Sequence, residues 1–124
     1  MNKQVLYLLL IFGFHLCESQ SIAVLKYDGG GDWYSNPTAL KNLIQFCNTN
    51  ILTVINKKPQ SVEAGSTAIF EYPFIHMTGH GNVLFSESDS KNLRTYLLSG
   101  GFLHIDDNYG MKPYVIEALK NVFP

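Results

Sequence analysis

The chain has 124 residues, with 9 Lys and Arg against 10 Asp and Glu and a formal net charge of −1. This length suits one domain with a single hydrophobic core and leaves little room for a second. The basic residues form no stripe, which excludes the electrostatic surface that nucleic-acid-binding proteins use. We therefore expect a single domain that does not bind nucleic acid.

The N-terminal segment has the pattern of a secretory signal peptide. Lys3 precedes an unbroken apolar run over residues 5–14, and small residues follow it. We predict that residues 1–19 are removed before Gln20 and that the mature protein is periplasmic or secreted. The run is shorter than the roughly 20 residues of a membrane span, so an uncleaved anchor is the minor alternative. Cys47 would be the one remaining cysteine, and no internal disulfide is expected.

The first half of the mature chain predicts two strands on either side of one helix. Residues 22–27 form a β-rich run that stops at a glycine-rich loop. Ser35 or Asn36 is expected to cap a helix over residues 37–48, where apolar residues recur at helical spacing. Residues 51–55 are all apolar or β-branched, which predicts the second strand.

The second half predicts two further strands and three helices. Ser86 and Asp89 have the spacing of a capping box, and the pair Gly100 and Gly101 ends the helix that follows. Pro113 favours the first turn of the last helix, whose residues expected to face the core are Val115, Ile116, Leu119, Val122 and Phe123. The expected elements are a short helix over residues 66–70, a strand over 72–77, the helix after Ser86, a strand over 102–105 and the helix from Pro113.

Strands that alternate with helices at this spacing form right-handed βαβ units and a parallel sheet. We therefore predict an α/β fold with a parallel sheet in a single domain over residues 20–124; if the domain is a flavodoxin-like three-layer α/β/α domain, its strand order is 2-1-3-4. In such a sheet the ligand lies beyond the carboxyl ends of the strands, where the strand order reverses. The loops expected to meet there span residues 28–33, 78–82 and 106–110.

Asp106, directly after the fourth strand, is the first candidate catalytic residue. Asp106 and Asp107 are neighbours on extended backbone, so their side chains should point to opposite sides, and one should enter the cleft. Two nearby carboxylates can raise one pKa for acid/base work or hold a divalent cation, which is the one cofactor that we consider. The alternative role for Asp107 or Asn108 is to cap the turn before the last helix.

His80 is the second candidate catalytic residue, because it stands between Gly79 and Gly81, whose neighbourhood can aim backbone N–H groups at an anion. Its alternative role is that of an ordinary turn histidine. His76 and His104 lie in predicted strands and are interpreted as core histidines. The expected ligand-binding residues, drawn from all three loops, are Asp28, Gly30, Asp32, Trp33, Gly79, Gly81, Asn82, Asp107, Asn108 and Tyr109.

Three motifs in the chain are DGGGDWY at residues 28–34, PFIHMTGHGN at residues 73–82 and GGFLHIDDNYG at residues 100–110. In this order they resemble domain-of-unknown-function family 4159, a family of bacterial exported proteins. The resemblance spans residues 22–124 and implies the class I glutamine amidotransferase-like variety of the flavodoxin-like fold. The family domain is usually longer, so the resemblance also implies a sheet truncated at its C-terminal side.

The resemblance to the glutamine amidotransferase-like superfamily also bears on whether the site hydrolyses glutamine. In amidotransferases the fourth strand leads into an elbow that carries a nucleophilic cysteine, and Asp106 stands at that position here. A carboxylate does not replace a thiolate in glutamine hydrolysis without different partners, and the histidine and glutamate of the triad normally lie beyond residue 124. The resemblance therefore disfavours glutaminase and amidotransferase activity.

A cleft without a nucleophile and base favours a binding module. We expect it to bind a small polar ligand, a carbohydrate or an anionic fragment of the cell envelope, with Trp33, Tyr34 and Tyr109 placed to stack on a sugar ring. The first alternative is a hydrolase in which Asp106, aided by His80 and a divalent metal, activates water. The second is a structural half of an assembly, a homo-oligomer joined through an exposed sheet edge.

Overall fold

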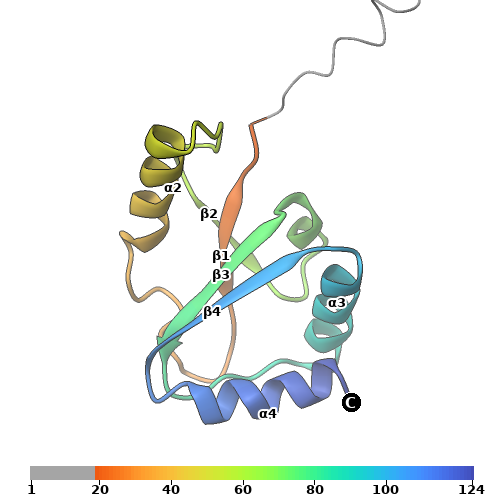
Figure 1. Ribbon diagram of the computed structural model, residues 1–124. Coiled ribbons are helices and arrows are strands. Elements are labelled where there is room, and N and C mark those ends of the chain that lie inside the picture. Colours follow the sequence, from red (N-terminus) through yellow and green to blue (C-terminus); the bar gives the residue numbers. More distant parts are fainter. Residues whose placement is uncertain (1–18) are drawn as a thin grey trace, which may run out of the picture.

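The computed structural model describes residues 19–124, so the predicted signal peptide lies, apart from its last residue, outside the described residues. They form a four-stranded, all-parallel sheet of order β2-β1-β3-β4 with helices on both faces (Figure 1). This is the predicted flavodoxin-like α/β architecture, and no helix within residues 19–124 is long and apolar enough to cross a membrane. The elements are β1 (Ile22–Lys26), α2 (Ala39–Asn50), β2 (Gln60–Glu63), the 3-10 helix η1 (Thr67–Glu71), β3 (Phe74–His80), α3 (Glu87–Leu98), β4 (Phe102–Tyr109) and α4 (Lys112–Val122).

Alternation of side chains along the strands divides the core in two. Leu25 and Ile75, both fully buried, belong to a large cluster that includes residues of η1, α3 and α4. Ile22 is at an alternate position of β1, so its side chain faces the other side of the sheet, where it packs with Leu40 and Ile44 of α2. Because successive strand residues face opposite sides, the sheet lies between α2 on one face and α3 with α4 on the other (Figure 1).

Two local predictions are confirmed by their capping bonds. Asp89 N–H donates to Ser86 Oγ at 3.1 Å, and Ser86 N–H donates to Asp89 Oδ2 at 2.9 Å, which completes the capping box of α3. The expected short helix is η1, at whose start Ser66 Oγ accepts a bond of 3.2 Å from Ala68 N–H. These caps satisfy backbone donors that a helix start leaves free.

The second strand lies further along the chain than predicted. Residues 51–55 lie outside the sheet, apart from a single bridge between Ile55 and Gln20. Leu52 is 84 % exposed, so the apolar run that predicts a strand here is not buried as one. β2 begins only at Gln60, pairs with β1 and buries one of its four side chains, Val62. The prediction of a strand over 51–55 is therefore wrong.

Two helix predictions are wrong in detail. Thr38 is the N-cap of α2, so neither Ser35 nor Asn36 caps that helix. In α4, Ile116 and Phe123 are 49 % and 46 % exposed, whereas the other residues expected to face inward are buried or packed against the core. The apolar face of α4 is thus narrower than its sequence indicates.

Candidate functional site

β3 and β4 run further than the sequence indicates, and this extension builds the site. β3 continues to His80 and β4 to Tyr109, with Asp106 paired to Thr78 in register. The acids of β4 therefore lie on the strand itself, and the prediction that this strand ends at residue 105 is wrong. A register shift between Gly79 and His80 interrupts the pairing, and such shifts re-aim the side chains at a strand end.

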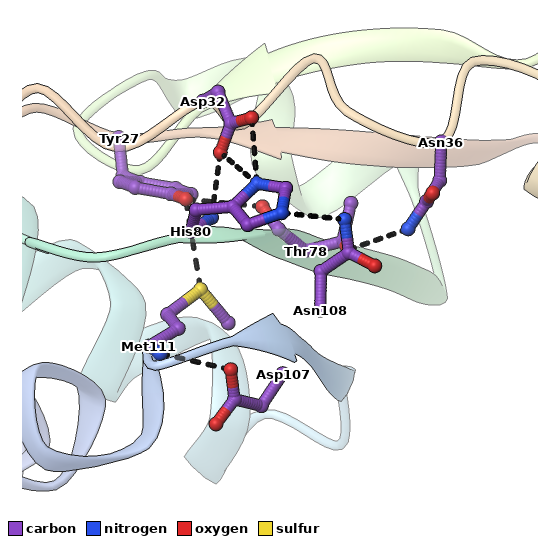
Figure 2. Close-up of polar contacts among 8 residues, drawn as sticks. All are labelled: Tyr27, Asp32, Asn36, Thr78, His80, Asp107, Asn108 and Met111. Carbon is purple, nitrogen blue, oxygen red and sulfur yellow. Dashed lines mark hydrogen bonds and ion pairs between the residues drawn. The ribbon is translucent and has the colours of Figure 1, made fainter.

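Asp32 and His80 form the centre of the site. Asp32 Oδ2 and Oδ1 lie 2.7 and 2.9 Å from His80 Nδ1, and the backbone N–H of His80 donates to Oδ1 at 2.6 Å (Figure 2). A carboxylate can only accept, so Nδ1 carries the proton and the orientation of the ring is fixed. Both side chains are partly exposed to solvent.

The other ring nitrogen of His80 faces β4. Asn108 Nδ2 lies 3.3 Å from His80 Nε2, and this nitrogen, when it carries no proton, can accept a hydrogen bond from the amide (Figure 2). Next to this pair, Asn36 Nδ2 donates to Thr78 Oγ1 at 3.3 Å. The structure thus brings together one group from the loop after β1, one from β3 and one from β4.

The charge on Asp32 is favoured by its partner. Burial raises the pKa of the Asp32 carboxyl, but the hydrogen bonds from the ring and backbone of His80, together with the charge of the ring, outweigh it. The net effect is a pKa below the ordinary value of 3.8. Asp32 is therefore ionised at neutral pH, and its carboxylate accepts the hydrogen bond from the imidazole.

Tyr27 and Gly79 fix the loop that carries Asp32. The Tyr27 hydroxyl donates to the carbonyl oxygen of Thr78 at 3.0 Å and lies 3.6 Å from Met111 Sδ (Figure 2). A Cβ on Gly79 would collide with that hydroxyl and lie 3.2 Å from the Asp32 carbonyl oxygen, so only glycine fits. Burial, followed by the charge of Asp32, raises the pKa of Tyr27 to about 12, so the phenol remains a donor.

Asp107 has the structural role that the sequence left open. Its carboxylate accepts from Met111 N–H at 2.8 Å and from Lys112 N–H at 3.1 Å, which caps the start of α4. Asp106 has the opposite orientation, because neighbouring strand residues face opposite sides and Asp106 alternates with His104, whose Nδ1 lies 3.0 Å from His76 Nδ1. Asp32, and not Asp106, is the carboxylate hydrogen-bonded to His80.

A polar cavity of about 310 Å³ lies beside the ends of β1 and β2. Asp28 and Trp33, both predicted ligand-binding residues, line it together with Glu63. Lys26 also lines it, with Nζ 5.3 Å from the centre of the Trp33 ring. Tyr27, whose hydroxyl donates to Thr78 O beside the His80 site, also lines this cavity.

The remaining predicted residues lie at the rim or outside it. Gly30 and Gly81 have φ of 84° and 65°, and no atom lies within 4 Å of where their Cβ would be. Tyr109 is 79 % exposed. Asn82 lines a separate small hollow against α4, so the structure does not bring it to His80. Among residues 19–124 no group of three or more His, Cys, Asp or Glu is arranged to hold a metal ion.

Three residues of the site were missed by sequence reasoning: Tyr27, Asn36 and Thr78. Tyr27 ends a predicted strand and resembles an ordinary strand residue, and Thr78 begins one of the predicted loops but was not singled out within it. Asn36 has a φ of 57°, which frees its side chain from the helix that it was expected to cap. Asparagine adopts this left-handed conformation more readily than most residues, and this preference is the one sequence signal that could have identified Asn36.

A family model described as Domain of unknown function (DUF4159) matches residues 21–124. The match covers every described strand and helix. No curated protein matches the chain.

Proposed function

Since the chain belongs to the DUF4159 family, whose description assigns no activity, we propose from its geometry that the protein binds a small neutral polar ligand of the carbohydrate type. The observation that carries this proposal is the fixed His80 ring, with Asp32 on one nitrogen and Asn108 on the other. A few convergent polar groups at the carboxyl end of a parallel sheet are the usual form of a ligand site.

The charge of the surrounding segments favours a neutral ligand over an anionic one. Residues 26–36, 78–83 and 106–112 contain four carboxylates against two cations, Lys26 and Lys112. An anion would meet a net negative charge there, whereas sugar hydroxyls can donate to carboxylates and accept from amide N–H groups. The neutral carbohydrate is therefore the better of the two predicted ligand classes.

Aromatic rings at the rim support the same ligand class. Tyr34 and Tyr109 are 66 % and 79 % exposed, and Trp33 lies edge-on to Tyr34 with ring centres 5.6 Å apart. Exposed aromatic faces offer the C–H face of a sugar ring an apolar surface beside polar groups that bind its hydroxyls.

The test is an NMR titration of the protein with a panel of neutral mono- and disaccharides, beside the corresponding uronic acids. We expect shift changes at His80 and Asn108 with neutral sugars, and weaker ones with the acids. His80→Ala should weaken binding about tenfold or more, since it removes the ring that holds both Asp32 and Asn108 in place for the ligand. Asn50→Ala, which removes an exposed polar side chain at the end of α2, is the control and should bind normally. The absence of shifts up to about 10 mM sugar would refute the proposal.

The Asp32 and His80 pair also favours a second candidate, a hydrolase. With Nδ1 held by a carboxylate, Nε2 of the imidazole can act as a general base when a bound water displaces the Asn108 amide from it, and general-base catalysis typically contributes about 10²–10⁴-fold to a rate. Asp106 and a metal ion, the earlier candidates for this role, would be additions to that pair. Hydrolysis of acetylated sugars that is lost in His80→Gln would favour this reading over simple binding.

A further inference from the structure

The loop after α2 exposes apolar side chains that a folded domain usually buries. Ile51, Leu52 and Val54 are 62 %, 84 % and 61 % exposed. Leu52 also has a φ of 58°, a left-handed conformation that is rare for a bulky residue and costs conformational energy. Backbone strain of this kind is typical of functional positions, where the surrounding structure enforces it. The loop thus holds a leucine in solvent in a conformation that glycine or asparagine would adopt more easily.

Hydrogen bonds within the loop fix its shape. The Asn48 amide donates to the carbonyl oxygen of Ile55 at 2.8 Å. The side-chain oxygen of Asn48 accepts from the Ile55 N–H at 2.9 Å and from the Thr53 hydroxyl at 2.8 Å. Because these polar groups bond to one another, they need no water when the apolar side chains beside them enter an apolar medium.

The chain around this loop is positively charged. Residues 33–62 contain Lys41, Lys57 and Lys58 and neither Asp nor Glu. Lys57 and Lys58 directly follow the loop and are exposed. The rest of residues 20–124 contains five Lys and Arg against nine Asp and Glu, so the positive and negative charges of the chain are separated. An anionic surface would attract the molecule by the part that carries the loop.

We propose that residues 51–58, here called the docking loop, bind the surface of an anionic lipid bilayer. Ile51, Leu52 and Val54 enter the boundary between headgroups and acyl chains, and Lys57 and Lys58 bind lipid phosphates. Apolar side chains beside a basic segment are the combination that holds peripheral proteins on anionic membranes.

The N-terminal segment enters the domain beside the docking loop, which favours a bilayer over a protein as the occupant. Ser19 Oγ donates to the carbonyl oxygen of Val54 at 3.1 Å, and Gln20 pairs with Ile55 (Figure 1). The apolar run of residues 5–14, predicted to direct export, ends five residues before Ser19. Five residues span at most about 18 Å, so a run that enters a bilayer brings this end of the domain to its surface.

Docking in this way would also orient the ligand site. β1 begins next to Gln20, at the amino edge of the sheet, whereas the His80 site lies at the carboxyl ends of the strands. The His80 site would therefore face away from the bilayer and remain open to water.

The test places a single tryptophan in the docking loop of the full chain. On a Trp33→Phe background, Leu52→Trp is compared with Leu84→Trp, which replaces another exposed leucine, in the segment after β3 at the opposite edge of the sheet. The vesicles contain phosphatidylglycerol and phosphatidylcholine whose acyl chains carry bromine, which quenches tryptophan. The Leu52→Trp variant should lose most of its fluorescence, and the Leu84→Trp variant should keep it. Equal quenching of both variants, or of neither, would overturn the proposal, because binding through residues 5–14 alone would not select the loop.

The charge of the lipid and of the lysines gives a second readout. Adding Lys57→Glu and Lys58→Glu to the Leu52→Trp variant should weaken the quenching interaction about tenfold or more, since two attractions to the anionic surface become repulsions. Lys112→Glu with Lys120→Glu, the same change of net charge on α4, is the matched control and should have little effect. Equal losses in the two pairs, or full quenching on pure phosphatidylcholine, would overturn the role of Lys57 and Lys58 and with it the proposal.

Leu52→Asn separates docking from folding. Asparagine adopts a left-handed φ readily, so this variant should unfold at the same or a higher urea concentration than wild type. Added to a Val54→Trp variant on the Trp33→Phe background, the same substitution should reduce quenching by the brominated vesicles. A loss of stability would assign Leu52 a structural role and overturn the proposal, and so would quenching that Leu52→Asn leaves unchanged.

Discussion

The residues that meet at the site were largely predictable, but their partnerships were not. Parallel strands bring their carboxyl ends to one edge, so Asp32, His80 and Asn108 were expected to converge. The carboxylate that bonds His80 is set by the path of the glycine-rich loop of residues 28–33. Because glycine adopts many backbone conformations, the sequence does not determine that path. Asp106 is adjacent in the sheet, yet it is Asp32, 48 residues from His80, that holds the ring.

The pairing of Asp32 with His80 predicts a measurable titration. The carboxyl of Asp32 should titrate below 3.8, because His80 stabilises its ionised form. Its contribution to stability is therefore complete above that pH and is lost as the pH falls through the lowered pKa. In His80→Ala, ¹³C NMR should show the Asp32 midpoint move upward. Glu87, whose pKa is lowered by Lys91, should keep its midpoint, and an unmoved Asp32 would show that the pairing is absent in solution.

At the scale of elements, helix α3 followed its sequence signals and strand β2 did not. The Asn48 side chain binds the N–H and C=O of Ile55 at 2.9 and 2.8 Å, which holds the apolar run 51–55 as a loop after α2. Leu52 completes that loop with a φ of 58°. The true strand reads Gln-Ser-Val-Glu and lies at the edge of the sheet, so it has no apolar run by which to find it.

The cap on α4 is the element whose contribution can be isolated. Asp107→Ala should lower the free energy of unfolding by about 1–2 kcal/mol, because it leaves two backbone donors at a helix start unpaired. Asp28→Ala removes an exposed carboxylate with no such bonds and should change stability by less than about 0.5 kcal/mol. Urea unfolding of the two variants measures the difference. Equal effects would mean that the Asp107 bonds contribute nothing.

For the whole molecule, the sequence predicts a sheet between two layers of helices. It does not predict that α3 and α4 cover one face of the sheet more fully than α2 covers the other. The cluster under α3 and α4 contains most of the buried residues, whereas α2 buries only Ile22, Leu40 and Ile44 with a few partly buried neighbours. On the α2 side the sheet instead ends in a stack of Phe and His rings. His76, which is 5 % exposed, has a buried Nε2 without a hydrogen-bond partner.

This buried histidine makes the fold sensitive to acid. Burial, and then the charge of His104, lower the pKa of His76 below 6.5, against a smaller raising effect of Asp106. The unfolded chain binds this proton more readily, so stability is complete above about pH 6.5 and is lost as the pH falls toward the lowered value. Urea unfolding at neutral and at mildly acidic pH should show the loss, and His76→Phe should reduce it. A loss that persists in the variant would assign it to another group.

The contact of Tyr27 and Asp32 with Gly79 has a consequence for the energetics of recognition. The loop of residues 28–33 is seated on the end of β3 before any ligand arrives, with its hydrogen bonds already made. A ligand would meet polar groups whose conformational entropy was lost during folding, and it would not have to order them. Weak individual contacts could then yield useful affinity, because folding has already met the entropic cost of arranging the site.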